Sequence, residues 1–321
     1  MGEFDLIDRY FKRPARHADL GIGDDCALLR TTPGHQLAMS TDMLVEGRHF
    51  LSTVAPHHLG HKALAVNLSD LAACGARPKA FLLSLAMPRA DEAWLAGFSA
   101  GLFALADLHD CELIGGDTTH GPLNIAITVL GEVPQGKALL RSGARAGDDL
   151  YVSGTLGDAR LALEAFRGHV SLPEAVFAQA RSRMETPTPR VQLGMALRGV
   201  ASAAADISDG LLGDLGHILK ASGVGASIEL AATETLMACR SQWSCPTELT
   251  HTCILSGGDD YELVFTAPPH CREQVQHASV SAQTPVTRIG HICAGTGVQV
   301  LNRGGQALTR HFTSFDHFAN P

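Results

Sequence analysis

Acidic residues recur along this sequence beside glycine, serine and threonine. Asp24 and Asp25 follow a Gly-Ile-Gly tripeptide, and Asp42 follows Ser40 and Thr41. Other aspartates stand in the same kind of context: Asp70, Asp117, Asp206, Asp209, Asp259 and Asp260. Carboxylate and hydroxyl oxygens are the ligands that Mg²⁺ prefers, with water and phosphate. One such pair is usually a solvated turn, but the repetition predicts that several of these residues bind a hard cation.

The elements expected around these aspartates place most of them at the end of a strand or helix. We expect strands at 26–29, 36–41 and 203–207, a short strand at 112–114 followed by a loop at 115–119, and a helix at 211–221. A long helix at 56–74 carries Asp70 near its carboxyl end, where the helix dipole disfavours an anion. A cation near Asp70 would therefore explain its position.

The order of expected elements indicates an α/β fold in two domains. Helices and strands alternate through both halves, and both halves share the habit of ending a strand in an acidic loop. The chain has 321 residues, and domains usually hold about 100–200. We expect an N-terminal domain at 1–140 and a C-terminal domain at 141–321. Residues 232–250 show no clear element.

The composition excludes several classes of function. Hydrophobic residues make up 45% of the chain and charged residues 18%, with a formal net charge of −8. No basic surface is expected, so nucleic acid is not a predicted partner. An acidic protein that handles phosphates must neutralise them with metal ions, arginine or backbone N–H groups.

Cysteine usage and hydropathy predict a cytoplasmic protein with no membrane partner. None of the eight cysteines forms a Cys-x-x-Cys pair, so a zinc ribbon or a redox dithiol is poorly supported. The first residues are too charged for a signal peptide. No run approaches the roughly 18 apolar residues that a membrane span needs.

Two other patterns, a near P-loop and a group of histidines, are weak evidence for a binding site. Residues 131–138 nearly form a phosphate-binding P-loop, but Ala138 lacks the hydroxyl that would bind Mg²⁺ and Pro134 interrupts the loop. Histidines 57, 58 and 61 open the long helix and are more simply read as exposed or capping residues. His49 is the better candidate, since it closely follows the Asp42 segment.

Six segments occur in an order and spacing that together are highly specific. They are GIGDDCA (21–27), STDMLVEGRHF (40–50), AVNLSDLAACGA (65–76), GGDTT (115–119), DISDGL (206–211) and SGGDDYEL (256–263). The sequence thereby resembles the thiamine-monophosphate kinase family. This family belongs to the superfamily of aminoimidazole ribonucleotide synthetase and selenophosphate synthetase. The resemblance runs from about residue 3 to residue 318.

The resemblance implies a PurM-like fold of two mixed α/β domains, with metal and ATP sites and the dimer contact in the N-terminal domain. It implies a homodimer whose active-site cleft involves the partner subunit. The implied activity is ATP-dependent phosphorylation of thiamine monophosphate to thiamine diphosphate, the last step of thiamine diphosphate biosynthesis. Several Mg²⁺ ions are the implied cofactor, and ATP is the co-substrate.

The resemblance also implies roles for individual residues. The implied metal ligands are Asp25, Ser40, Thr41, Asp42, Asp70, Asp117, Asp206 and Asp209. The implied ATP contacts are Gly116, Asp117, Arg141 and Ser208. The implied contacts to thiamine monophosphate are His49, Asp259 and Phe315. The family usually has Glu where this sequence has Asp259, so the side chain that would make this contact is shorter here.

The chemistry implied by the resemblance needs no strong general base, because the acceptor phosphate is already anionic near neutral pH. Sister enzymes remain as alternatives. Selenophosphate synthetase would need a reactive residue in an N-terminal glycine-rich loop, whereas the first cysteine here is Cys26. A hydrogenase-maturation relative would end in a reactive cysteine, and this chain ends in Pro321. Aminoimidazole ribonucleotide synthetase and a non-catalytic module that binds ATP and Mg²⁺ stay open.

Overall fold

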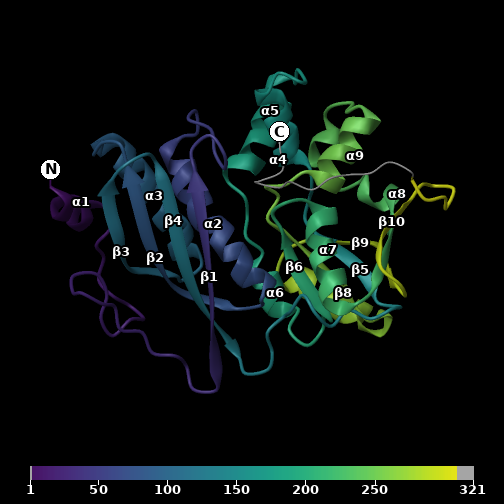
Figure 1. Ribbon diagram of the computed structural model, residues 1–321, viewed down its shortest axis with the longest axis horizontal. Helices are drawn as coiled ribbons and strands as arrows, with labels where there is room; N and C mark the ends of the chain where they lie inside the picture. The colour runs from purple at the N-terminus through teal and green to yellow at the C-terminus, as the bar shows by residue number, and fades with distance from the viewer. Residues whose placement is uncertain (1, 309–321) are drawn as a thin grey trace. The chain divides into compact units, whose positions relative to one another are not determined.

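The computed structural model describes residues 2–308 (Figure 1). The chain divides into two compact units. The N-terminal unit comprises Met1–Leu71 and Ala76–Gly136, and the C-terminal unit comprises Ala72–Gly75 and Lys137–Pro321. Both contain helices and a mixed sheet, as an α/β fold requires. No helix within residues 2–308 is long and apolar enough to cross a membrane.

The N-terminal unit is built on a four-stranded sheet with the order β1-β4-β2-β3. Strands β1 and β2 pair antiparallel with β4, whereas β2 and β3 run parallel. The bounds are α1 (Glu3–Tyr10), β1 (His35–Val45), α2 (Pro56–Ala73), β2 (Arg77–Met87), α3 (Glu92–Leu108), β3 (Glu112–His120) and β4 (Asn124–Pro134).

Helices α2 and α3 cover one face of this sheet. They approach so closely that a Cβ on Gly60 would lie 2.0 Å from the Phe98 carbonyl oxygen, and one on Gly101 would lie 1.8 Å from that of His57. Only glycine allows this crossing. On β2 alternate residues (Phe81, Leu83, Leu85 and Met87) point into the resulting core.

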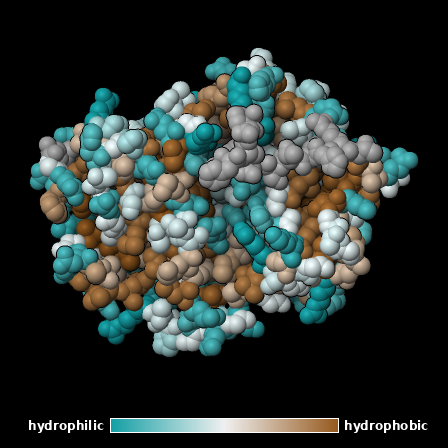
Figure 2. All heavy atoms as spheres, viewed as in Figure 1, coloured by the Kyte–Doolittle hydropathy of each residue, from teal (hydrophilic) through white to brown (hydrophobic). Residues whose placement is uncertain are grey.

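The other face of the four-stranded sheet is open in the single chain. On β1 the side chains of Leu37, Met39 and Met43 are 40%, 63% and 55% exposed. Figure 2 shows apolar side chains gathered over the strands of the N-terminal unit. A long edge strand with apolar side chains on its open face is unusual for a surface that faces only water.

The C-terminal unit contains a six-stranded sheet with the order β10-β7-β9-β5-β8-β6. Its strands are β5 (Asp149–Ser153), β6 (Ala203–Ile207), β7 (Gly225–Glu229), β8 (Glu262–Ala267), β9 (Val286–Cys293) and β10 (Gly297–Leu301). Its helices are α4 (Asp158–Phe166), α5 (Glu174–Glu185), α6 (Val191–Ala196), α7 (Leu211–Ser222), α8 (Leu230–Thr233), η1 (Ala238–Ser241), α9 (Thr247–Ser256), η2 (Pro269–Cys271) and α10 (Arg272–Ser281).

Three neighbouring strands at one side of the six-stranded sheet, β5, β8 and the edge strand β6, are covered on both faces. Every residue of β5, β6 and β8 is buried. The strands accordingly consist of near-continuous small or apolar runs, such as 203–205 on β6 and 263–265 on β8. This sheet is therefore a rigid base for the loops at the ends of its strands.

Several expected elements differ in the structure. Residues 26–29 form no strand, and Leu28 makes only an isolated bridge to Leu20. Residues 115–119 are part of β3 rather than a loop, because β2 pairs with them through Thr119. Helix α9 begins inside the segment that showed no clear element, and α10 was not expected. Their apolar residues are few and spaced between polar ones, so tertiary packing decides their structure.

Candidate functional site

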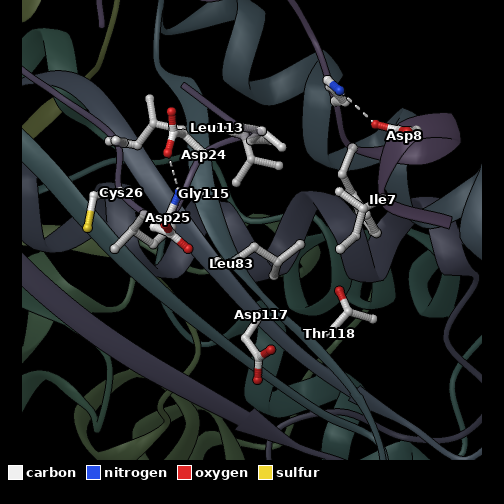
Figure 3. A pocket seen from close by; sticks show the side chains of 18 of the residues that line it. Ile7, Asp8, Asp24, Asp25, Cys26, Leu83, Leu113, Gly115, Asp117 and Thr118 are labelled. Atoms are coloured by element: carbon white, nitrogen blue, oxygen red, sulfur yellow. Dashed lines mark hydrogen bonds and ion pairs between the residues drawn. The ribbon is translucent and has the colours of Figure 1, made fainter. Parts of the chain in front are cut away.

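A cavity of about 1010 Å³ lies in the N-terminal unit (Figure 3). Residues of α1, the 22–29 segment and β3 line it, including Ile7, Asp25, Leu113 and Asp117. Helix α1 contributes the apolar side chains of Phe4 and Ile7, which lie one turn apart on the same face of the helix. The 22–29 segment and β3 contribute carboxylates. The cavity therefore combines apolar side chains with several carboxylates, Glu3 and Asp8 of α1 among them, as a site for a polar ligand with an apolar part does.

The Asp24–Asp25 pair forms a turn in the wall of this cavity. The Asp24 carboxylate accepts the backbone N–H of Asp25 at 2.9 Å, so Asp24 shapes the turn (Figure 3). The side chain of Asp25 is exposed. The two neighbouring carboxylates thus have different roles in the structure, one holding the backbone and one projecting from it.

A second group of oxygen donors lies between β1 and α2. The Ser40 hydroxyl donates to the Asp70 carboxylate at 2.5 Å, which joins the strand to the carboxyl half of the helix. Asp42 lies two residues further along the strand and so on the same face as Ser40. Its backbone N–H donates to the Asn67 side chain at 3.1 Å. The structure therefore brings Ser40, Asp42 and Asp70 to one place.

Thr41 and Asp117 belong to the opposite face of the sheet. The Thr41 hydroxyl donates to the Ile127 carbonyl at 3.1 Å and accepts from Thr128 at 3.1 Å. Asp117 pairs in register with Ser84 of β2, and both residues line a hollow of about 370 Å³ with Met43. Within one N-terminal unit, Asp117 therefore does not join Asp42 and Asp70.

His49 is held by the backbone of the turn that follows β1. Its Nδ1 accepts the N–H of Val45 at 3.0 Å, which places the proton of the neutral ring on Nε2. The buried Lys62 donates to the His49 carbonyl at 3.1 Å. The backbone of this turn therefore fixes the orientation of the His49 ring.

The end of β6 and the loop that leads from it into α7 carry three of the predicted site residues: Asp206, on the strand and 7% exposed, and Ser208 and Asp209, in the loop. The carboxylate of Asp214, one turn into α7, accepts the backbone N–H groups of Ser208, Asp209 and Gly210 at 3.1 Å each. Burial and the nearby Asp209 carboxylate raise the pKa of Asp214 to about 7, against the three donors, which lower it. We call residues 206–210 the acidic loop.

A second loop, at 256–261, pairs with the acidic loop. The N–H groups of Asp259 and Tyr261 donate to the carbonyls of Ser208 and Ile207, each at 2.9 Å. Asp259 and Tyr261 both have positive φ angles, 69° and 51°. Gly210 also has a positive φ, and a Cβ there would lie 2.9 Å from the Ser256 carbonyl carbon. The two sequence motifs thus form one double loop.

Buried charges fix the base of this double loop. Glu262 has no solvent exposure and binds Arg190 at 2.5 Å, Arg183 at 3.0 Å and the Ser153 hydroxyl at 2.7 Å. Asp260 is also buried and accepts the Gly157 N–H at 3.0 Å, and burial raises its pKa. Glu262 was not singled out from the sequence, whereas Asp260 was one of the aspartates considered there as cation ligands, and in the structure it accepts a backbone N–H instead.

The remaining predicted residues lie apart from these groups or outside the described chain. Arg141 is exposed, and its carbonyl accepts the Ser222 hydroxyl at 3.1 Å. Gly116 lines the large cavity beside Asp117. Phe315 lies outside the described residues. In the part of the chain from 2 to 308, no three histidine, cysteine, aspartate or glutamate side chains form a group that could hold a metal ion.

The residues whose roles sequence reasoning missed bind other groups of the protein, such as backbone N–H groups or buried arginines, rather than a ligand. Asp214 could have been found, because an acidic residue in the first turn of a helix that begins after glycine is a common device for binding free N–H groups. Asp260 and Glu262 lie inside a recognised motif, but nothing in their spacing separates a buried residue from an exposed one.

Two family models match the chain. The model described as AIR synthase related protein, N-terminal domain, matches residues 23–133. The model described as AIR synthase related protein, C-terminal domain, matches residues 145–301.

Curated and solved relatives match along nearly the whole chain. A thiamine-monophosphate kinase of Salmonella typhimurium is 46% identical, covering 100% of this chain and 99% of its own. A crystal structure of thiamine-monophosphate kinase from Stenotrophomonas maltophilia is 44% identical, covers 96% of this chain and 98% of that one, and has a TM-score of 0.85. The structure of AaThiL complexed with AMPPCP and TMP is 31% identical, covers 90% and 89%, and has a TM-score of 0.75.

Proposed function

We propose that this chain, which belongs to the thiamine-monophosphate kinase family, transfers the γ-phosphate of ATP to thiamine monophosphate and releases thiamine diphosphate. Relatives of this name match it over essentially their whole length, and one was solved with AMPPCP and TMP. AMPPCP is ATP with a methylene group in place of the β,γ-bridging oxygen. The full-length match to these kinases is the observation that carries the proposal.

The main obstacle to this reaction is repulsion between two anions. Two like unit charges about 4 Å apart cost around 4 kcal/mol at an effective dielectric constant near 20, and several such pairs meet here. The attacking oxygen belongs to a phosphate monoester, so no strong base is needed to activate it. Catalysis then rests on positioning and on charge neutralisation.

The chemistry of the donor atoms fits Mg²⁺, which this fold family implies, and phosphate oxygens of the substrates would complete the ligands of each ion, because no three acidic or histidine side chains of residues 2–308 form a metal-binding group by themselves. We propose as ligands Asp25, Ser40, Thr41, Asp42, Asp70, Asp117, Asp206 and Asp209. All offer the hard oxygen atoms that Mg²⁺ prefers, and the Ser40–Asp70 contact shows two of them side by side. Bound Mg²⁺ would supply positive charge that offsets the repulsion between the phosphates. Thr41 would contribute through its carbonyl, because its hydroxyl faces the other way.

The protein's own groups would orient the two substrates. We propose that Gly116, Asp117, Arg141 and Ser208 contact ATP, with the Arg141 guanidinium able to bind a phosphate through two hydrogen bonds. We propose that His49, Asp259 and Phe315 contact thiamine monophosphate. The hydrogen bond from the Val45 N–H to Nδ1 holds the His49 ring in one orientation, which supports a positioning role for this residue.

We also propose that the chain forms a homodimer through the open face of the four-stranded sheet. The exposed row of Leu37, Met39 and Met43 supports this, since a second copy could bury it. The domain boundary between 140 and 141, with the dimer contact in the N-terminal domain, is part of the same proposal. A cytoplasmic location fits the eight free cysteines among the described residues.

One assay tests the activity. Purified protein is incubated with ATP, Mg²⁺ and thiamine monophosphate, and thiamine diphosphate is measured by chromatography. Unphosphorylated thiamine is the control acceptor and should give no product. Absence of thiamine diphosphate at saturating substrates would refute the proposal.

A second experiment addresses the chemical route. We expect direct transfer between the two substrates, because no nucleophilic side chain is required when the acceptor phosphate attacks. Incubation with γ-³²P-ATP without acceptor, followed by acid quenching, should leave the protein unlabelled. A stable covalent ³²P label on the chain would overturn direct transfer.

A further inference from the structure

The acidic loop has the backbone geometry of an anion site, but the chain itself fills that site. Three successive N–H groups at the start of a helix, here those of Ser208, Asp209 and Gly210, are the arrangement that binds phosphate in many nucleotide-binding proteins. In this chain all three donate to a single atom, Oδ2 of Asp214. The amides are therefore occupied by an internal carboxylate.

The other side of the same backbone is occupied as well. The carbonyls of Ile207 and Ser208 accept the N–H groups of Tyr261 and Asp259. A Cβ on Gly258 would lie 2.4 Å from the Ser208 carbonyl oxygen, so the two loops are in close contact. With these three amides and two carbonyls engaged, the acidic loop offers a ligand chiefly its side chains, which include the carboxylate of Asp209 in the turn and that of Asp206, 7% exposed, at the end of β6.

We propose that Asp214 is a positioning residue that commits the acidic loop to binding cations through its side chains rather than phosphate through its amides. It acts by holding three consecutive amides, and through the paired loop it also fixes the backbone of Asp259. This proposal rests on the proposed kinase function for its kinetic consequences. Its structural part, the occupied amides, stands on the hydrogen bonds alone.

The chain offers a matched control for substitution of Asp214. Asp148 is a buried carboxylate of the same unit, 4% exposed, that accepts the Arg145 N–H at 3.0 Å and the Ser202 hydroxyl at 2.6 Å. Asp148 directly precedes Asp149, which pairs with Ala267 at the last residue of β8. Ile207 of the acidic loop pairs with Glu262, at the first residue of β8. Asp148→Ala therefore removes a comparable anchor far from the acidic loop.

The test compares Asp214→Ala, Asp214→Asn and Asp148→Ala with the wild-type chain. Affinity for Mg²⁺ with AMPPCP is measured by calorimetry, the Mg²⁺ concentration for half-maximal turnover by assay, and amide hydrogen exchange at 208–210 by mass spectrometry. For Asp214→Ala we expect faster exchange at 208–210 and at least a tenfold loss in both Mg²⁺-dependent quantities. Asp214→Asn keeps an acceptor oxygen and should recover most of the loss. Asp148→Ala should leave all three measurements within about twofold.

Two outcomes would overturn the proposal. One is faster exchange at 208–210 with unchanged affinity for Mg²⁺ and AMPPCP. The other is an equal loss in Asp214→Ala and Asp148→Ala, which would show a general effect on folding. If Asp214→Ala does not fold, the test rests on Asp214→Asn. Wild-type Mg²⁺ affinity and wild-type amide exchange in Asp214→Asn would support the role of Asp214 as a hydrogen-bond acceptor. Impaired affinity together with impaired exchange protection would refute it. If wild-type protein makes no thiamine diphosphate, the kinase proposal fails while binding and exchange still test Asp214.

Discussion

The sheets of the two units differ in how much of their surface is covered by other elements. In the N-terminal unit α2 and α3 cover one face of four strands, and the other face exposes Met39 and Met43. In the C-terminal unit β5, β6 and β8 are buried along their whole length. The four-stranded sheet thus has an exposed apolar face, whereas the part of the six-stranded sheet formed by β5, β8 and β6 has none.

The predicted ligands follow the same division. In the N-terminal unit they are side chains projecting from strands and helices, and the two faces of the sheet separate Asp42 from Asp117. In the C-terminal unit they stand on a loop whose backbone is fixed on both sides. The comparison teaches that the C-terminal unit places its carboxylates by itself, whereas the N-terminal unit presents them on surfaces that can still accept partners.

The largest expected effect comes from the carboxylates on the two faces of the open sheet. Asp42→Asn and Asp117→Asn should fold normally and lose turnover at least about a hundredfold, because each removes a charge that offsets phosphate repulsion. Steady-state kinetics at saturating Mg²⁺ measure this. Asp107→Asn, an exposed residue paired with Arg13, is the control and should stay within twofold. Near-wild-type turnover in either variant would remove that residue from the ligand set.

The next effect concerns buried charge in the two sheets. Glu262→Gln should destabilise the chain by about 3–5 kcal/mol, because Arg183 and Arg190 would lose their buried counterion. The matched change is Glu132→Gln in the four-stranded sheet, where Glu132 is 1% exposed but one partner, Arg77, is 57% exposed. We expect a smaller loss there. Urea unfolding measures both, and an equal loss would contradict the contrast between a closed and an open sheet.

Acid should weaken both sheets over the same range of pH. Burial alone would raise the pKa of Glu132, but Lys79 and Thr32 lower it to about 2. Hydrogen bonds from Arg272 and Arg288, against burial, lower the pKa of Asp149 to about 2. A lowered folded pKa gives stability that is complete above the usual carboxyl range and is lost as pH falls toward 2.

We expect the free energy of unfolding to fall between about pH 5 and pH 2, by an amount of order 2 kcal/mol for each of these carboxylates. Urea titrations at several pH values measure this slope. Glu132→Gln and Asp149→Asn should each flatten it. A slope unchanged in both variants would assign the acid sensitivity to other groups.

For a substitution on the open face of the four-stranded sheet, we predict a change in oligomeric state rather than in stability. Met39→Glu places a charge in the exposed apolar row and should convert the proposed dimer into monomer, with little change in helix content. Light scattering coupled to size exclusion reads the mass. Leu108→Glu, at the end of α3 and 75% exposed, is the control and should not alter it. A dimer that persists in Met39→Glu would move the interface elsewhere.

The smallest expected effect is at Asp259. Asp259→Glu introduces the residue usual in the family but places a longer side chain at a φ of 69°, where Asp is better tolerated than Glu. We expect KM for thiamine monophosphate to change by less than tenfold and kcat to hold. A large fall in kcat would show that the length of this side chain matters to the reaction itself.

The sequence predicted most of the strands and helices because their apolar residues repeat at clear spacing. It failed at 115–119, where glycines suggested a loop but pairing with β2 makes a strand. The family membership, the α/β fold and the positions of the motifs follow from order and spacing of short segments. Which aspartates share a face does not, because it depends on the register between strands, as the separation of Asp42 from Asp117 shows. The assignment of ligands to metal, ATP and thiamine monophosphate remains a prediction.

The position of β5 in its sheet has a consequence for synthesis of the chain. Its neighbours are β8 and β9, which begin at Glu262 and Val286, more than a hundred residues after β5 ends at Ser153. At roughly 5–20 residues per second, about 5–25 seconds pass on the ribosome before the first of these partners exists. Through that interval a strand that is fully buried in the folded chain has no sheet to join, so the nascent C-terminal unit is the stage at which chaperones would matter most.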